Sequence, residues 1–296
     1  MSTMKSKISF IVAMVIFGTL SLFVKNISVS SGELALYRAI LASIIIGAYL
    51  LVTKQKIDFK AIKKELIIIS LSGMAMGFNW IFLFEAYKNT TISVATLSYY
   101  FAPIIVMIIC PILFKEKITL KQWICFIVAT IGIILIVGVS ENNGTNNHLI
   151  GVLLGLTAAV FYATVIILNK YIKSISGIHR TFIQFIAAII VLIPYVSFTS
   201  GFSIITLNTK GWINLLIVGI IHTGITYCLY FSSLKNLTGQ SVAVLSYIDP
   251  LVAIMVSFII GETMMLIQII GGILLILSTI LNEVKFVRDK KTIGKN

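Results

Sequence analysis

Long apolar runs separated by short polar segments make up almost the whole chain. An α-helix needs about 20 apolar residues to cross the hydrocarbon core of a bilayer. Ten runs of suitable length occur, at residues 8–24, 34–53, 66–87, 92–114, 122–139, 149–169, 181–199, 211–233, 240–260 and 264–284. We therefore predict an all-α integral membrane protein with ten transmembrane helices. Too little chain lies between the runs for a separate soluble domain.

The composition and the distribution of charge support this prediction. Of the 296 residues, 58% are hydrophobic and only 11% are charged, whereas about a quarter of a soluble domain is charged. If the N-terminus is cytoplasmic, 19 of the 23 lysines and arginines fall in cytoplasmic segments. This asymmetry predicts a multi-pass protein of the cell membrane with both termini in the cytoplasm. The net charge of +13 therefore reflects membrane topology, and we expect no nucleic-acid partner.

Two features at first suggest other classes of protein. The first apolar run follows Lys5 and Lys7, as in a secretory signal, but it is long, has no clear cleavage site and precedes nine more runs. We expect it to be a retained helix. Cys110, Cys125 and Cys228 all lie inside apolar runs, which argues against a disulfide framework or a metal cluster. We expect no metal and no cofactor.

The two halves of the chain repeat each other. The segment "YKNTTISVATLSYYFAP" at residues 87–103 aligns with "LKNLTGQSVAVLSYIDP" at residues 234–250, with one residue of slippage before the proline. Two polar pairs recur downstream at equal spacing: Glu116 and Gln122, and Glu262 and Gln268. We predict one repeat at residues 8–139, a second at 149–284 and a basic cytoplasmic tail at 285–296. Because each repeat has five spans, an odd number, the second enters the membrane inverted relative to the first.

The ends of the two repeats resemble a known family. Each has a proline, then a glutamate, then a glycine-containing last helix, as in "FKEKITLKQWICFIVATIG" and "IIGETMMLIQIIGG". In this order the repeats look like the two EamA repeats of the drug/metabolite transporter superfamily, over about residues 8–284. The resemblance implies a secondary carrier with a central cavity, which works by alternating access. Members of the family move amino acids and their derivatives, sugars, vitamins or toxic organic compounds.

Polar and aromatic residues at the depth of the membrane indicate where a substrate binds. Inverted repeats place the substrate site at their interface, near the middle of the membrane. Tyr and Trp rings suit a planar, aromatic or cationic solute, although core packing explains any single ring equally well. The candidate cavity residues are Asn79, Trp80, Tyr99, Tyr100, Tyr162, His222, Thr226, Tyr227, Tyr247 and Asp249. Pro103 and Pro250 remove a helix hydrogen bond at equivalent places, so we predict helix irregularities there, either as hinges or as static kinks.

Asp249 is the acid that distinguishes "AVLSYIDP" from its echo "ATLSYYFAP". An ionisable group at this depth is costly and is a functional hypothesis by default. Three interpretations stay open: Asp249 caps a helix that restarts at Pro250, it binds a cationic substrate group or titrates with His222 in proton coupling, or nearby hydroxyls satisfy it. We expect Arg38 and Glu33 to lie near the outer surface, where they could form a gate but more simply snorkel into water. Glu116 and Glu262 are expected to cap or pair locally.

These observations favour a secondary transporter of a small organic metabolite, most simply an exporter of an amino acid or a related compound. Protons are a candidate coupling ion, and the sequence does not decide whether the protein forms a homodimer. An importer of a vitamin such as riboflavin is the first alternative. An intramembrane enzyme or a channel is the second, but no H-E-x-x-H motif or P-loop occurs. We therefore expect no enzymatic activity.

Overall fold

The computed structural model describes residues 3–114, 119–137, 147–175, 177–234, 237 and 245–283. Every regular element in these ranges is helical, so the all-α prediction is confirmed. The first repeat contains α1 (Thr3–Gly18), α2 (Leu20–Val24), α3 (Ser31–Val52), α4 (Phe59–Ile62), α5 (Leu66–Asn89), α6 (Ile92–Tyr99), α7 (Ala102–Phe114) and α8 (Leu120–Val137). The second contains α9 (Asn147–Tyr171), α10 (Gly177–Thr199), the 3-10 helix η1 (Ile204–Thr206), α11 (Thr209–Leu216), the π-helix η2 (Ile217–Ile225), α12 (Thr226–Leu234), α14 (Ile248–Ile259) and α15 (Leu266–Glu283).

The predicted number of ten spans is supported only in part. In the described ranges, seven helical segments are long and apolar enough to cross a membrane. Three further apolar helices are shorter, at Leu120–Ile136, Ile248–Ile259 and Leu266–Leu281. The ninth run contributes a short helix because the chain turns at Tyr247 before α14 begins, and residues 240–244 lie outside the described residues.

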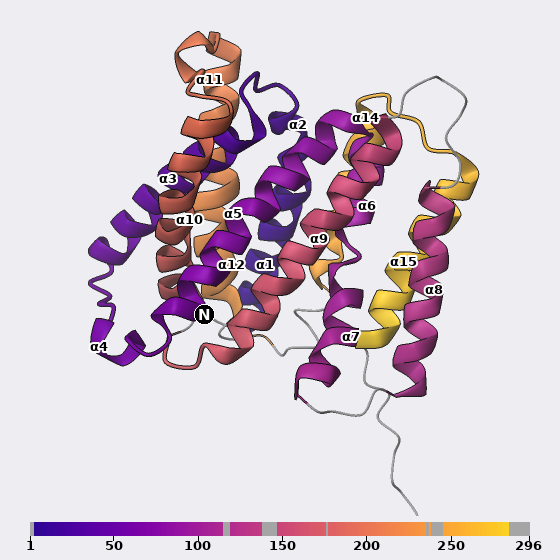
Figure 1. The fold of residues 1–296 in the computed structure, drawn as a ribbon, viewed down its shortest axis with the longest axis horizontal. Coiled ribbons are helices and arrows are strands. Elements are labelled where there is room, and N and C mark those ends of the chain that lie inside the picture. The colour runs from indigo at the N-terminus through magenta and orange to yellow at the C-terminus, as the bar shows by residue number, and fades with distance from the viewer. Residues whose placement is uncertain are drawn as a thin grey trace, which may run out of the picture.

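The helices of one repeat pack mainly on helices of the other. α5 lies against α9 and α10, α3 against α10 and η2, and α1 against α12 and α14. Figure 1 shows α8 and α15 side by side at one edge of the bundle, where they contact each other far more than their other neighbours. The interface between the repeats is therefore the centre of the structure.

Side chains at the helix ends explain several of the boundaries. Ser30 caps α3 by accepting a hydrogen bond from the backbone N–H of Glu33, and Thr91 caps α6 in the same way through Val94. Such caps satisfy N–H groups that the first turn of a helix leaves without partners. α6 ends at Tyr99 because Pro103, in the first turn of α7, cannot continue the helix.

Glu65 fastens the beginning of α5 to the segment between α9 and α10. Its carboxylate accepts hydrogen bonds from the Ser174 hydroxyl and from the backbone N–H groups of Lys173 and Ser174. These bonds, that of the Ser174 hydroxyl above all, lower the pKa of Glu65. The contact joins the two repeats at the end of the bundle where the N-terminus lies (Figure 1).

The middle of the eighth apolar run is wound as a π-helix. Thr223 Oγ1 donates a hydrogen bond to the carbonyl of Val218 at 2.8 Å, and Thr226 Oγ1 donates to that of Ile221 at 2.7 Å. Both bonds reach back five residues, which matches the wider turn of η2. π-Helical turns are rare and often lie at functional sites. The wider turn also changes the face of the helix on which the side chains after η2, in α12, lie.

Glycines allow α8 and α15 to touch through their backbones. A Cβ atom at Gly132 would lie 2.7 Å from the carbonyl oxygen of Gly271, and one at Gly271 would lie 2.6 Å from that of Gly132. Small residues permit such close approach of helices in membranes. A side chain at either position has to push the two helices apart.

We therefore expect Gly132→Ala to lower the apparent melting temperature of the protein in detergent, because overpacking costs about 1–3 kcal/mol. Gly47→Ala is the matched control, because its Cβ would meet only Phe182, at an ordinary 3.4 Å. Heating followed by size-exclusion chromatography measures both variants. Equal melting temperatures would contradict the backbone contact.

Candidate functional site

A cavity of about 570 Å³ lies between the two repeats. It extends from the level of Tyr99 and Tyr227, in the middle of the bundle, to the end at which α9 finishes and α10 begins. Residues from both repeats line it, including Met14 and Phe17 of α1 and Tyr162 of α9. The cavity therefore lies at the repeat interface, as expected for a substrate site between inverted repeats.

Six of the ten candidate cavity residues line this space, and so does Pro103. They are Tyr99, Tyr100, Tyr162, Tyr227, Tyr247 and Asp249. The other four, Asn79, Trp80, His222 and Thr226, together with Pro250, do not line it. The lining residues fall into an aromatic wall, an acidic group and a basic, amide-rich group.

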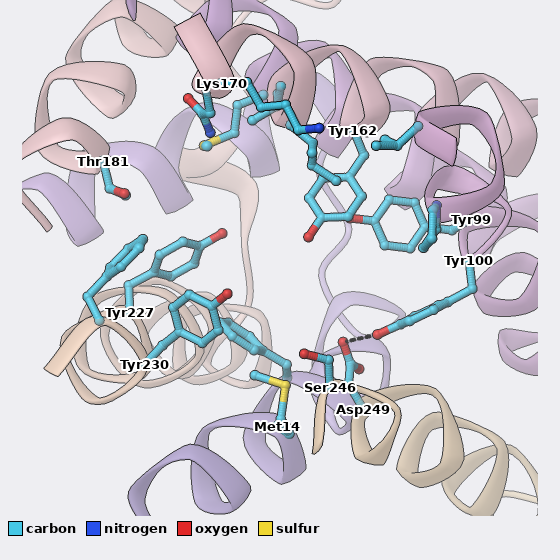
Figure 2. A pocket seen from close by; sticks show the side chains of 18 of the residues that line it. Met14, Tyr99, Tyr100, Tyr162, Lys170, Thr181, Tyr227, Tyr230, Ser246 and Asp249 are labelled. Atoms are coloured by element: carbon cyan, nitrogen blue, oxygen red, sulfur yellow. Dashed lines mark hydrogen bonds between the residues drawn. The ribbon is translucent and has the colours of Figure 1, made fainter. Parts of the chain in front are cut away.

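Tyrosine and phenylalanine rings form the aromatic wall. Tyr99 lies against Tyr162 with the ring centroids 5.2 Å apart, and Phe17 meets Tyr227 edge to face at 5.4 Å. Tyr230 lines the cavity beside Tyr227 (Figure 2). Such rings offer flat apolar faces and hydroxyl groups at their edges. The wall therefore suits a solute with a planar part.

Asp249 and Tyr100 form the acidic group. The Tyr100 hydroxyl donates a hydrogen bond of 2.6 Å to Asp249 Oδ2, drawn as a dashed line in Figure 2. Tyr100 directly follows α6 in the first repeat, and Asp249 lies in the first turn of α14 in the second. The bond therefore joins the two copies of the repeated segment. A carboxylate accepts one bond here and keeps further capacity to accept others.

This geometry decides against the helix-capping interpretation of Asp249. α14 begins at Ile248, one residue before Asp249, and its N-cap residue is Tyr247, with no side-chain cap hydrogen bond. The turn at Tyr247 allows the helix to start early, so that Asp249 lies inside it and its side chain faces the cavity. Of the three interpretations, satisfaction by a hydroxyl is what the structure shows, and a role with substrate is compatible with it.

A basic, amide-rich group lies across the cavity from Asp249. Figure 2 shows Lys170 on this opposite side, and Arg180 also lines the cavity. Gln184 and Asn169 also line the cavity, and Gln184 Nε2 donates hydrogen bonds to Asn169 Oδ1 at 2.8 Å and to Ser72 Oγ at 2.6 Å. Sequence reasoning missed this group as a site because it counted the charges only as markers of topology. The signal available was their place in the first or last turn of a long apolar helix.

The candidates outside the lining have structural partners. Asn79 Nδ2 donates a hydrogen bond of 2.7 Å to the carbonyl of Ala158, which joins α5 to α9. Trp80 is buried with its ring 5.3 Å from that of Phe185. Thr226 bonds back to its own helix. All three side chains are buried in the packed core of the protein.

His222 is also away from the cavity, and the expected meeting with Asp249 does not occur. His222 Nε2 lies 3.1 Å from Thr19 Oγ1, and its ring lies 4.8 Å from that of Phe23. The recorded hydrogen-bond partner of the Asp249 side chain is instead Tyr100. His222 belongs to the π-helix. Its side chain therefore points in a different direction from the one it would have in a regular α-helix.

The expectation of snorkelling for Arg38 and Glu33 is wrong. Glu33 is fully buried and accepts hydrogen bonds from the backbone N–H and the hydroxyl of Ser203, at 2.6 and 2.5 Å. Arg38 is 3% exposed, and its guanidinium lies 4.5 Å from the centre of the Trp80 ring. Both side chains turn inward because residues of the second repeat, Ser203 and Thr223, bind them. The sequence positions of Glu33 and Arg38 do not reveal these partners.

The end of the bundle opposite the basic group is closed by polar contacts around Glu262. This carboxylate forms an ion pair with Lys25 and accepts hydrogen bonds from the backbone N–H of Ile92 at 2.7 Å and from Ser257 Oγ at 2.5 Å. We expected a local cap or pair, but Glu262 also joins the two repeats. Glu116, its counterpart, lies outside the described residues.

The fold and the cavity define a multi-pass membrane protein built from two repeats around an internal binding space. The model of the EamA-like transporter family matches residues 4–138 and 149–283, so the chain belongs to this family. Both repeats are matched, which confirms the resemblance seen in the sequence. The protein is thus a membrane transporter, and its family implies a small-molecule substrate.

Similar proteins agree on the class and leave the substrate open. An uncharacterized transporter of Bacillus subtilis, YxxF, is 31% identical over 83% of this chain and 79% of its own length. An uncharacterized transporter of Archaeoglobus fulgidus is 23% identical over 90% of this chain and 92% of its own length. One crystal structure aligns with a TM-score of 0.63 over 94% of this chain and 96% of that chain. At 16% identity, this last likeness concerns the fold alone.

The bond between Tyr100 and Asp249 predicts a measurable coupling in stability. We expect Tyr100→Phe to lower the melting temperature at neutral pH, because a hydrogen bond to a charged group contributes about 1.5–3 kcal/mol. In an Asp249→Leu background the same change should have little effect. Tyr162→Phe, on the same wall, is the control. Equal effects of Tyr100→Phe in both backgrounds would argue against the bond.

Proposed function

We propose that the protein is a secondary carrier that exports an amino acid or a closely related metabolite by alternating access. The observation that supports this most directly is the cavity itself, in which a carboxylate and a basic group lie on opposite sides of a space lined by aromatic rings. A zwitterion matches such a site, because its ammonium group pairs with Asp249 and its carboxylate is attracted by Lys170 and Arg180. The aromatic wall accommodates the side chain.

The two ends of the cavity have different roles in this proposal. Lys170 and Arg180 lie near the mouth, where basic side chains raise the local concentration of anionic groups. Asp249 lies deeper, and its charged partner would be held by a strong hydrogen bond in a space with little water. A substrate would thus approach with its carboxylate attracted at the mouth and settle with its amine at Asp249.

The inverted repeats supply the transport mechanism. Equivalent segments of the two repeats meet at the site, as shown by Tyr99 and Tyr247, which hold the same place in "LSY" and both line the cavity. Two inverted halves can exchange their conformations and so expose one site to either side. Pro103 and Pro250, each in the first turn of a helix that restarts beside the site, are the proposed hinges.

The location belongs to the same proposal. We place the protein in the cell membrane with both termini in the cytoplasm, because 19 of the 23 lysines and arginines then fall in cytoplasmic segments. The cavity extends toward the end at which Lys170 and Arg180 lie, so in this proposal it faces the cytoplasm. An exporter loads its substrate from the cytoplasm, which this cavity permits. Proton coupling, if used, would involve Asp249 and Tyr100 without His222.

Transport in proteoliposomes tests the proposed substrate class. We expect saturable, gradient-driven uptake of radiolabelled L-phenylalanine, with weaker competition by 3-phenylpropionate, which lacks the amine, and by phenethylamine, which lacks the carboxylate. Riboflavin is included in the panel to test a vitamin carrier. Saturable transport of riboflavin without transport of phenylalanine would replace the amino-acid proposal, and unsaturable flux would indicate a channel.

The role of Asp249 is tested by Asp249→Asn, which keeps the size of the side chain and removes its charge. We expect normal expression, at least a tenfold loss of L-phenylalanine transport, and a flatter dependence of transport on pH. A tenfold loss corresponds to about 1.4 kcal/mol, which is modest for a charged hydrogen bond. Unchanged kinetics across pH 5 to 8, roughly the range of physiological titration, would contradict the charge-based role.

A further inference from the structure

Arg38 is a buried cation that the cavity does not account for. Its Nε donates a hydrogen bond of 2.6 Å to Thr223 Oγ1, and its guanidinium lies over the rings of Trp80 and Phe84, at 4.5 and 5.5 Å from their centres. Among the described residues, this is the one hydrogen bond recorded for the guanidinium, and no carboxylate lies within ion-pair distance of it. A guanidinium has five N–H donors, so its capacity is largely unused.

The position of Arg38 relative to the cavity is specific. A row of packed rings leads from Arg38 to the cavity. The guanidinium lies 4.5 Å from the centre of the Trp80 ring, that ring lies 5.3 Å from Phe185, and Phe185 lies 5.3 Å from Tyr227, which lines the cavity. Arg38 is therefore separated from the cavity by packed aromatic side chains, whereas Asp249 lines the cavity.

Burial of this charge is expensive without a partner. A charged side chain within a membrane segment is rare, and such residues mark substrate pathways more often than structural contacts. Stacking on Trp80 offsets part of the cost, and Thr223 accepts one bond. An apolar side chain would fill the same space without the cost of desolvation. The retained charge therefore points to a function in another conformation.

The second helices of the two repeats carry a comparable pair of arginines. Arg180 lies in the first turn of α10 and lines the cavity, whereas Arg38 lies in the second turn of α3 and is buried. Aligning Gly32 with Gly177 places the two arginines three positions apart, about one helical turn, and thus on the same side of their helices. Because the repeats are inverted, the two arginines lie toward opposite ends of the bundle.

We propose that Arg38 binds the carboxylate of the substrate when the protein is open to the outside. In that state the aromatic side chains between Arg38 and the cavity no longer separate Arg38 from Asp249. A zwitterion then bridges the two charges, with its ammonium group on Asp249 and its carboxylate on the guanidinium. Arg180 serves the carboxylate on the cytoplasmic side, and Arg38 replaces it on the other. This inference rests on the proposed function.

The test compares recognition of the carboxylate from each side of the membrane. Right-side-out and inside-out vesicles take up labelled L-phenylalanine while unlabelled L-phenylalanine or phenethylamine competes from the same side. The ratio of the two inhibition constants reports the contribution of the carboxylate and cancels the population of the state that faces that side. We expect Arg38→Gln to reduce this ratio roughly tenfold from outside and to leave it unchanged from inside. Arg180→Gln should show the reverse.

Two control variants separate binding from structure. Thr223→Val removes the hydrogen bond of Arg38 but keeps the guanidinium, so the ratio should be unchanged from both sides. Arg38→Lys keeps the charge and should retain most of the outside ratio. If Arg38→Gln leaves the outside ratio unchanged, or lowers both ratios equally, then Arg38 is only structural and the proposal is overturned.

A second measurement does not depend on the substrate. In a variant with its cysteines replaced by serine, Arg38→Cys should react with a membrane-impermeant thiol reagent added from outside and not from inside. Ile44→Cys, which is exposed on the lipid-facing side of the same helix, should stay unreactive because thiolates need water. Failure of Arg38→Cys to react from outside overturns the proposal. Absence of transport in the wild type, by contrast, would count against the proposed function.

Discussion

The absence of water from the bilayer core governs this structure more than any other constraint. Each polar group at that depth needs a partner within the protein, because lipid offers none. Threonine and serine hydroxyls meet this need locally, by bonding to carbonyls of their own helices, as Thr130 and Ser98 do. The remaining polar groups gather where the repeats meet. The position of the cavity is a consequence of this sorting.

Much of the fold could be predicted from the sequence because a lipid bilayer requires spanning helices of a defined length and apolar composition. Apolar runs of the length of a bilayer, an internal duplication and an uneven distribution of lysine fixed the repeat organisation before any contact was known. The site was predicted where its residues recur in both repeats, as with Tyr99 and Tyr247, or where an acid breaks the echo, as with Asp249. Repetition served as the signal.

The remainder could not be predicted because depth along a helix does not give the direction of a side chain. Asn79 and Trp80 are as deep as the cavity residues but face the packed interior. The π-helix changes the direction of the His222 side chain. No local pattern in the sequence predicts this π-helix. Arg180, near a helix end, was read as a marker of topology although it lines the cavity. In each case the missing information was the identity of the neighbouring helix.

The contacts of Glu262 imply that the closed end can open at little cost in free energy. The side chains of Lys25 and Glu262 are 30% and 14% exposed, so water can replace much of what the ion pair provides. Ion pairs that are exposed to water contribute about 0–1 kcal/mol. The bonds that hold this end of the bundle can therefore exchange with water.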